Sequence, residues 1–180
     1  PVFKYPVSPR EAVKAAYRRE PVWCLYGTET FPFSPKIIPD NVARGFSVEQ
    51  NPIGQEHFGG PDMFGVEWEY VPMAGGSMVR PGNPLMTDAN DWERAIRFPT
   101  REEIDGWGWE QSAEENKKFL SNDRANFFWF QNGCWFERLM SFMEVDNACI
   151  ALIDEDQKDA VKALFKKTTE LYCYLVDKCC

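Results

Sequence analysis

Residues 126–130, NFFWF, form a short run with hardly a polar side-chain atom. Gln131, Asn132 and Gly133 follow at once, and an amphipathic run, CWFERLMSFM, comes next at 134–143. A short apolar run bounded by turn residues indicates a buried strand, and the change to helical spacing indicates that a helix follows it. The sequence therefore predicts a βα unit with a tight loop.

Two other segments are expected to form strands. Residues 21–27, PVWCLYG, are typical of a short buried strand that ends at a glycine. In residues 64–70, FGVEWEY, apolar side chains alternate with glycine and glutamate, which is the period of a half-buried strand. Residues 71–86, VPMAGGSMVRPGNPLM, are apolar but broken by glycines and prolines, so we expect a loop there.

Helices are predicted at both ends of the chain. Ser8 is a suitable N-cap and Pro9 a suitable first residue for a helix that runs to about residue 20. From Asp154, which forms a capping-box arrangement with Gln157, apolar residues recur at helical spacing to the last residue. A polar helix is expected over 110–120, and because that last helix has no C-cap signal we expect the chain to end inside a larger fold.

The alternation of buried strands and helices predicts an α/β fold with a parallel sheet. Three strands are too few to cover their own edges, so we expect missing strands or a partner chain to supply the rest. With 180 residues, of which 44% are hydrophobic, the chain is long enough for one domain with a real core.

The net charge narrows the classes of partner, and the cysteine content indicates the cellular location. The formal net charge of -8 argues against nucleic acid and anionic membranes, and it favours a small neutral or cationic ligand. Four of the six cysteines lie in apolar segments, where free cysteine behaves as a small hydrophobe, which favours a reducing, cytoplasmic location. No apolar run is long enough for a transmembrane helix.

Four stretches in this order carry a family resemblance: REAVKAAYRREPVW, PDNVARGF, DMFGVEWEYVPMAGGSMVRPGNPLMTDANDWERAIRFP and CWFERLMSFMEVDNACIALIDEDQKDAVKALFKK. In them the sequence resembles the N-terminal half of the uroporphyrinogen decarboxylase superfamily, in particular its methyltransferase-like branch, which serves corrinoid-dependent methyl transfer. The resemblance covers nearly the whole chain. It implies that residues 1–180 are one domain, the first half of a (β/α)8 TIM barrel with an N-terminal helix and long loops after its strands.

In such a barrel, ligand-binding groups come from the C-terminal ends of the strands and the loops that follow. On that rule the substrate-binding candidates are Tyr26, Thr28 and Glu29 after the first strand, Glu67 and Trp68 on the second, and Gln131, Asn132 and Cys134 after the third. The loop 71–86 is then expected either to cover the barrel mouth or to pack on its own domain.

Two of these candidates have a specific chemical interpretation. Cys134 lies near a predicted helix N-terminus, where the helix dipole lowers the pKa of a thiol; the alternative is a packed apolar cysteine beside Trp135 and Phe136. Glu67 alternates with Val66 and Trp68, so it points either into the barrel or into solvent.

Metal and nucleotide motifs are absent from the sequence. His57 is the only histidine, and neither an H-E-x-x-H nor a phosphate-binding glycine motif occurs. The methyltransferase branch resembles enzymes in which a zinc ion, held by His and Cys of the C-terminal half, activates a thiol. The resemblance therefore implies that this chain alone binds no cofactor, and that corrinoid and zinc belong to the complete protein.

Three functions remain open from the sequence. The first is the N-terminal part of a corrinoid-dependent methyltransferase, inactive alone and partnered by the rest of the barrel and a corrinoid protein. The second is a non-catalytic half-barrel that binds or assembles with a second copy of itself. The third is a genuine uroporphyrinogen decarboxylase. The loop LYGTETF disfavours this function, because the decarboxylases resemble one another in an arginine that binds substrate carboxylates at this place, and here the loop has Glu29 and no arginine.

Overall fold

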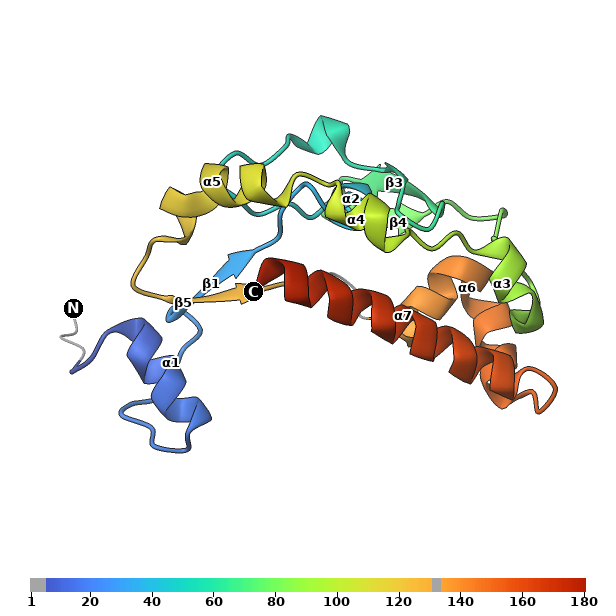
Figure 1. Ribbon diagram of the computed structural model, residues 1–180. Coiled ribbons are helices and arrows are strands. Elements are labelled where there is room, and N and C mark those ends of the chain that lie inside the picture. Colours follow the sequence, from blue (N-terminus) through green and yellow to red (C-terminus); the bar gives the residue numbers. More distant parts are fainter. Residues whose placement is uncertain (1–5, 131–133) are drawn as a thin grey trace.

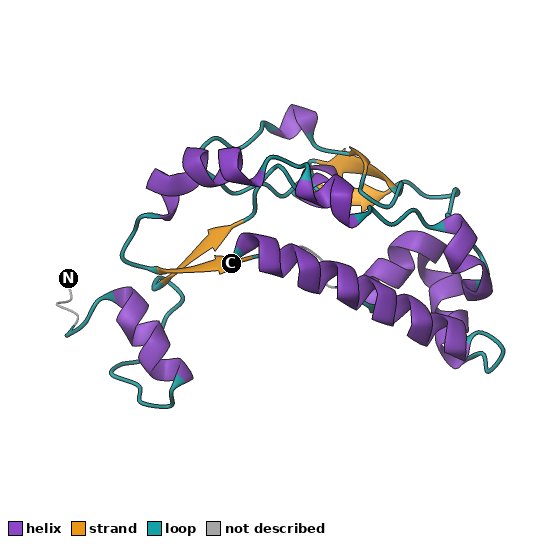
Figure 2. Cartoon of the chain, viewed as in Figure 1, coloured by secondary structure: helices purple, strands orange, loops and turns teal. Residues whose placement is uncertain are grey.

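The computed structural model describes residues 6–130 and 134–180 and shows a mixed α/β fold with two small sheets (Figures 1 and 2). The helices are α1 (Pro9–Tyr17), α2 (Pro39–Ala43), α3 (Trp92–Ala95), α4 (Arg101–Asp105), α5 (Trp109–Leu120), α6 (Phe136–Ile153) and α7 (Lys158–Cys179), with short 3-10 turns at Gln55–His57 and Ala89–Asp91. The strands are β1 (Thr30–Phe33), β2 (Gly60–Pro61), β3 (Glu67–Val71), β4 (Gly76–Val79) and β5 (Ala125–Phe128).

The two sheets differ in strand direction. β1 and β5 pair in parallel, with Thr30 opposite Ala125 and Phe33 opposite Phe128. β2, β3 and β4 form a separate antiparallel sheet, in which β3 and β4 are a hairpin. The expected parallel pairing is confirmed for β5, but the expectation that this strand is buried is wrong, because Asn126 and Phe127 are exposed. The strand predicted around residue 68 belongs to the antiparallel sheet. Within the described residues neither sheet closes into a barrel.

The predicted strand at 21–27 is wrong, because these residues form a loop and the strand begins only at Thr30. Gly27 has a φ of 89°, which turns the chain there. The Thr30 hydroxyl donates to the Gly27 carbonyl, and the Glu29 carboxylate accepts the Tyr26 N–H, so local hydrogen bonds stabilise a turn in place of an extended chain.

The loop expected at 71–86 is also partly wrong, because residues 76–79 form strand β4. Gly75, at a φ of 68°, closes a tight turn in which its N–H donates to the Val71 carbonyl. The turn brings Val79 opposite Trp68 in an antiparallel pair. Two glycines thus mark a hairpin turn here and not the end of the sheet.

The predicted terminal helices are largely confirmed. The Ser8 hydroxyl caps α1 by accepting the Glu11 N–H, and the buried face of α1 consists of Ala12, Val13 and Ala15. α7 begins at Lys158, with Gln157 as its N-cap residue and no side-chain cap, so the capping box expected at Asp154 is wrong. Its buried face contains six of the residues expected from helical spacing: Val161, Leu164, Thr168, Leu171, Tyr172 and Leu175.

The core lies between α6 and α7 on one side and a layer containing α2, α4 and the β3–β4 hairpin on the other (Figure 1). α6 is kinked at Glu144, which has a φ of 65° and a ψ of 166°. The kink frees the Phe142 carbonyl, which accepts the N–H groups of Leu85 and Met86. The Gly82 N–H donates to the Glu144 carboxylate at 2.6 Å, so the loop after β4 is attached to the helix at its break.

None of the helices in the described part of the chain combines the length and the apolar character that a bilayer span requires.

Candidate functional site

A buried group of four charged side chains and one tyrosine joins four separate parts of the chain. It consists of Asp40 and Arg44 at α2, Asp62 before β3, Arg138 on α6 and Tyr172 on α7, and is called the Arg138 cluster below. Arg138 donates to Asp62 at 2.7 Å, to Asp40 at 2.7 Å and to the Tyr172 hydroxyl oxygen at 3.0 Å. All five side chains are buried, so these contacts are made away from water.

Asp62 also organises the turn that leads into β3. Its Oδ1 accepts the backbone N–H groups of Phe64 and Val66, and its Oδ2 accepts the Trp68 indole N–H as well as Arg138. Four donors on one carboxylate satisfy both of its oxygens, as a buried charge requires. The turn and the ion pair therefore depend on the same side chain.

Arg44 completes the charge balance of the cluster. Its Nε donates to Asp40 at 2.8 Å, and its guanidinium carbon lies 4.4 Å from the centre of the Trp68 ring. Two arginines thus face two aspartates, and the Arg138 cluster carries no net charge when all four are ionised. Such pairing offsets part of the free energy needed to remove each charge from water. Among the described residues, both Nη atoms of Arg44 and the Nε of Arg138 are buried without a hydrogen-bond partner.

The surroundings fix the protonation of the cluster. Burial alone would raise the pKa of Asp40, but the charges of Arg138 and Arg44 outweigh burial and lower it from its usual value. Burial raises the pKa of the Tyr172 phenol, so this side chain stays protonated. Asp40 and Tyr172 are consequently suited to orienting neighbouring groups and not to transferring protons near neutral pH.

The lowered pKa of Asp40 predicts an acid-dependent loss of stability. An unfolded aspartate has a pKa of about 3.9. Asp40 therefore contributes stability that is fully present above that pH and is lost as the pH falls through its lower folded value. We expect the difference in unfolding free energy between the native sequence and Asp40→Asn to shrink steadily below about pH 4, as urea titrations would measure. A difference that stays constant down to about pH 2 would contradict this.

A cavity of about 470 Å³ lies beside the cluster, between the β3–β4 hairpin and α6, and is called the hairpin cavity below. Its apolar walls are Trp68, Met78, Val79, Pro81, Met140 and Val145. Its polar lining residues are Ser77, Glu137, Ser141 and Glu144. The Trp68 indole is bonded to Asp62 and the Ser141 hydroxyl to the Arg138 carbonyl, so the Arg138 cluster holds part of the cavity wall in place.

A second cavity, of about 380 Å³, lies at the start of α6 and is almost entirely apolar. Cys134, Cys173 and Tyr172 are among its lining residues. Burial raises the pKa of Cys134, which favours the packed cysteine over the alternative in which a helix dipole lowers that pKa. α6 begins only at Phe136.

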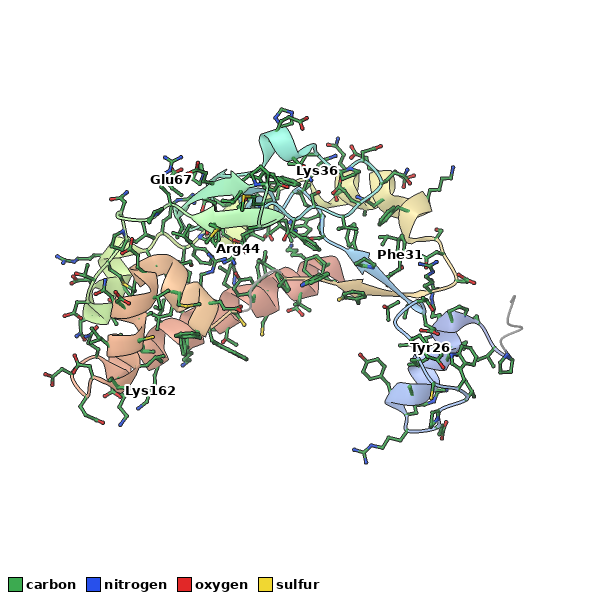
Figure 3. All side chains as sticks on the ribbon, turned by 180° about the vertical axis from the view of Figure 1, so that it is seen from behind. Tyr26, Phe31, Lys36, Arg44, Glu67 and Lys162 are labelled. Carbon is green, nitrogen blue, oxygen red and sulfur yellow. The ribbon has the colours of Figure 1, made fainter. Side chains whose placement is uncertain are left out.

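The structure separates the candidates predicted from the sequence. Tyr26, Thr28 and Glu29 precede β1 instead of following the first strand, whereas Cys134 follows β5. Because β1 and β5 are parallel, Tyr26, Thr28 and Glu29 lie at the N-terminal ends of the strands and Cys134 follows their C-terminal ends. Tyr26 is exposed beside α1, at the end of the molecule away from α6 (Figure 3). Glu29 is buried and accepts the Trp23 indole N–H, which is a role within its own loop.

The alternation expected along β3 is confirmed. Glu67 is exposed on the outer side of the hairpin, while Arg44 lies between the strand layer and the helices (Figure 3). Trp68 is buried, lines the hairpin cavity and donates its indole N–H to Asp62, so among the predicted residues that the structure describes it is the one that hydrogen-bonds to the Arg138 cluster. Gln131 and Asn132 lie outside the described residues. Sequence reasoning missed the cluster itself, although an arginine inside the apolar run CWFERLMSFM signals a buried acidic partner.

The described residues do not fit a zinc site. They place no group of three or more His, Cys, Asp and Glu side chains where a metal ion would be held. His57 is on the surface, 3.7 Å from Glu56. Comparisons with family models, with curated proteins and with solved structures each gave no match.

Proposed function

We propose that this chain is the N-terminal part of a uroporphyrinogen decarboxylase-like methyltransferase that acts with a corrinoid or a corrinoid protein. The observation that supports it best is the parallel pairing of β1 with β5, which are joined by a long connection. Parallel neighbours linked by crossovers are the building unit of a (β/α)8 barrel. The family resemblance along nearly the whole sequence adds to this support.

Exposed aromatic side chains support the idea that further strands complete the fold. Phe127 and Trp129 lie on or just after β5, and Trp135 and Phe136 lie at the start of α6; all four are exposed. An apolar sheet edge left open is a site for pairing with another strand. In our proposal the remaining β/α units pack here.

The proposed reaction moves a methyl group between cobalt and sulfur. A corrinoid bound by the complete protein would supply the methyl group and keep the electron pair of the bond that breaks, and a thiolate of the acceptor would form the new C–S bond. The described residues contribute walls and fixed charges and do not themselves fit the activating metal, so in this proposal the metal belongs to the rest of the protein. On this basis the chain alone is inactive.

The test uses methylcobalamin as donor and 2-mercaptoethanol as acceptor. The purified chain alone is expected to leave the uncatalysed rate unchanged. Addition of a polypeptide that supplies the missing strands and a His-x-Cys…Cys motif should produce demethylation that is visible by absorbance. Methyl transfer by the chain alone, or none by the full assembly, would contradict the proposal.

Native mass spectrometry tests the assembly directly. We expect Trp129→Ser together with Phe127→Ser to weaken association with the second polypeptide, because these changes remove exposed aromatic area from the interface. Met73→Ser, at the exposed tip of the β3–β4 turn, is the matched control and should associate normally. If the chain instead pairs only with itself, through these same aromatics, the non-catalytic assembly module is favoured.

A further inference from the structure

The hairpin cavity combines apolar walls with charge of one sign. Six of its lining residues are apolar and include one indole and two thioethers. Among the described residues that line it, the charged ones are Glu137 and Glu144, both acidic. A concave site with mostly apolar walls and a few placed polar groups is the usual form of a small-molecule site.

The neighbouring charges do not cancel these two carboxylates. The Arg138 cluster beside the cavity is neutral as a whole, since Asp40 and Asp62 balance Arg44 and Arg138. Arg80, between the lining residues Val79 and Pro81, is exposed and lies 3.9 Å from Glu69, so the charged groups that line the cavity itself are Glu137 and Glu144. Negative charge beside a partly desolvated apolar wall attracts a cation more strongly than the same charge on an open surface.

The kink in α6 places Glu144 at the cavity. Its backbone is in a region that residues other than glycine seldom occupy, and its carboxylate accepts the Gly82 N–H through Oε1. Glu137 lies two helical turns earlier, on the same side as Met140 and Ser141. Both carboxylates and the two residues between them thus face one space beneath the hairpin.

We propose that the hairpin cavity binds a small organic cation with an apolar body, of the alkylated ammonium class. The apolar walls contact the body, the Trp68 ring and the methionine sulfurs contact its polarised methyl groups, and the two glutamates balance its charge. Arg44 already lies against the Trp68 ring, but its charge is balanced by Asp40, whose carboxylate accepts the Arg44 Nε–H at 2.8 Å. This proposal does not rest on the methyl-transfer proposal, because binding of the cation is measured without any methyl transfer.

Isothermal titration with choline and with 3,3-dimethyl-1-butanol tests this proposal. The two molecules have nearly the same shape, and only choline is charged. With ionic strength held constant by exchanging sodium chloride for choline chloride, choline is expected to bind about tenfold more tightly than the alcohol. Glu137→Gln and Glu144→Gln should each weaken choline binding about fivefold. The second of these changes keeps a carbonyl oxygen on the side chain as an acceptor for the Gly82 N–H, which preserves the loop.

Controls separate the site from general effects of charge. Glu93→Gln changes an exposed carboxylate on α3 and should leave choline binding unchanged. Val145→Trp adds bulk at an exposed position on the cavity wall and should abolish binding, while circular dichroism shows that the helices persist. Equal binding of choline and the alcohol, no binding of either, or full choline binding by both glutamine variants would overturn the proposal.

Discussion

Arg138→Met is expected to lower the free energy of unfolding by about 4 kcal/mol, because it leaves two buried carboxylates without their main partner. Asp40 and Asp62 each accept a 2.7 Å hydrogen bond from this guanidinium. Methionine has a volume similar to that of arginine, so the loss of stability measures the missing charge and not the opening of a cavity. Urea unfolding followed by tryptophan fluorescence gives the value.

Arg94→Met is the matched control for this variant. Arg94 pairs with Asp91 at 2.6 Å on the surface, where an ion pair adds little stability. We expect a change below about 1 kcal/mol. If Arg138→Met were as mild as the control, the Arg138 cluster would not be an important source of stability.

Asp62→Asn is expected to lower the free energy of unfolding by about 3 kcal/mol, although the two side chains have nearly the same shape. Asp62 offers two acceptor oxygens to four donors, whereas asparagine has one oxygen and one NH₂ group. Either the Phe64 and Val66 N–H groups or the Trp68 and Arg138 donors then face another donor. Urea unfolding measures the loss, and faster amide exchange at Phe64 and Val66 locates it.

Asp159→Asn, on the exposed first turn of α7, serves as the comparison and should change stability by less than about 0.5 kcal/mol. The double variant Arg138→Met, Asp62→Asn adds a second check. Residues in one hydrogen-bond network are not additive, so the double variant should lose less than the sum of the two single changes. Strict additivity would mean that the two side chains act separately.

Local sequence patterns predicted the helices whose structure depends on residues close together in the sequence. The Ser8 cap of α1 and the buried face of α7 followed from hydrogen-bonding chemistry and helical spacing. The prediction of a strand at residues 21–27 was wrong, because a short apolar run does not distinguish a strand from a loop. The turn there depends on the Gly27 conformation and on the Glu29 carboxylate. β4 was missed because Gly75 was interpreted as a break in the sheet and not as a hairpin turn.

The candidate site was less predictable because its contacts are distant in sequence. Arg138 and Asp40 are 98 positions apart, and Arg138 and Asp62 are 76 apart. No periodicity in the sequence indicates which buried acid meets which buried base. Trp68 was the exception, since alternation along its strand predicted on which face it lies, and that face meets the cluster.

The long separation between these partners has a consequence for synthesis on the ribosome. Asp40 leaves the exit tunnel 98 residues before Arg138, which at translation speeds of roughly 5–20 residues per second is about 5–20 s earlier. During that interval Asp40 and Asp62 have no Arg138 to pair with, so burying them is unfavourable. The nascent N-terminal segment should therefore remain open to chaperones until α6 emerges, and it should fold only from that point of synthesis onward.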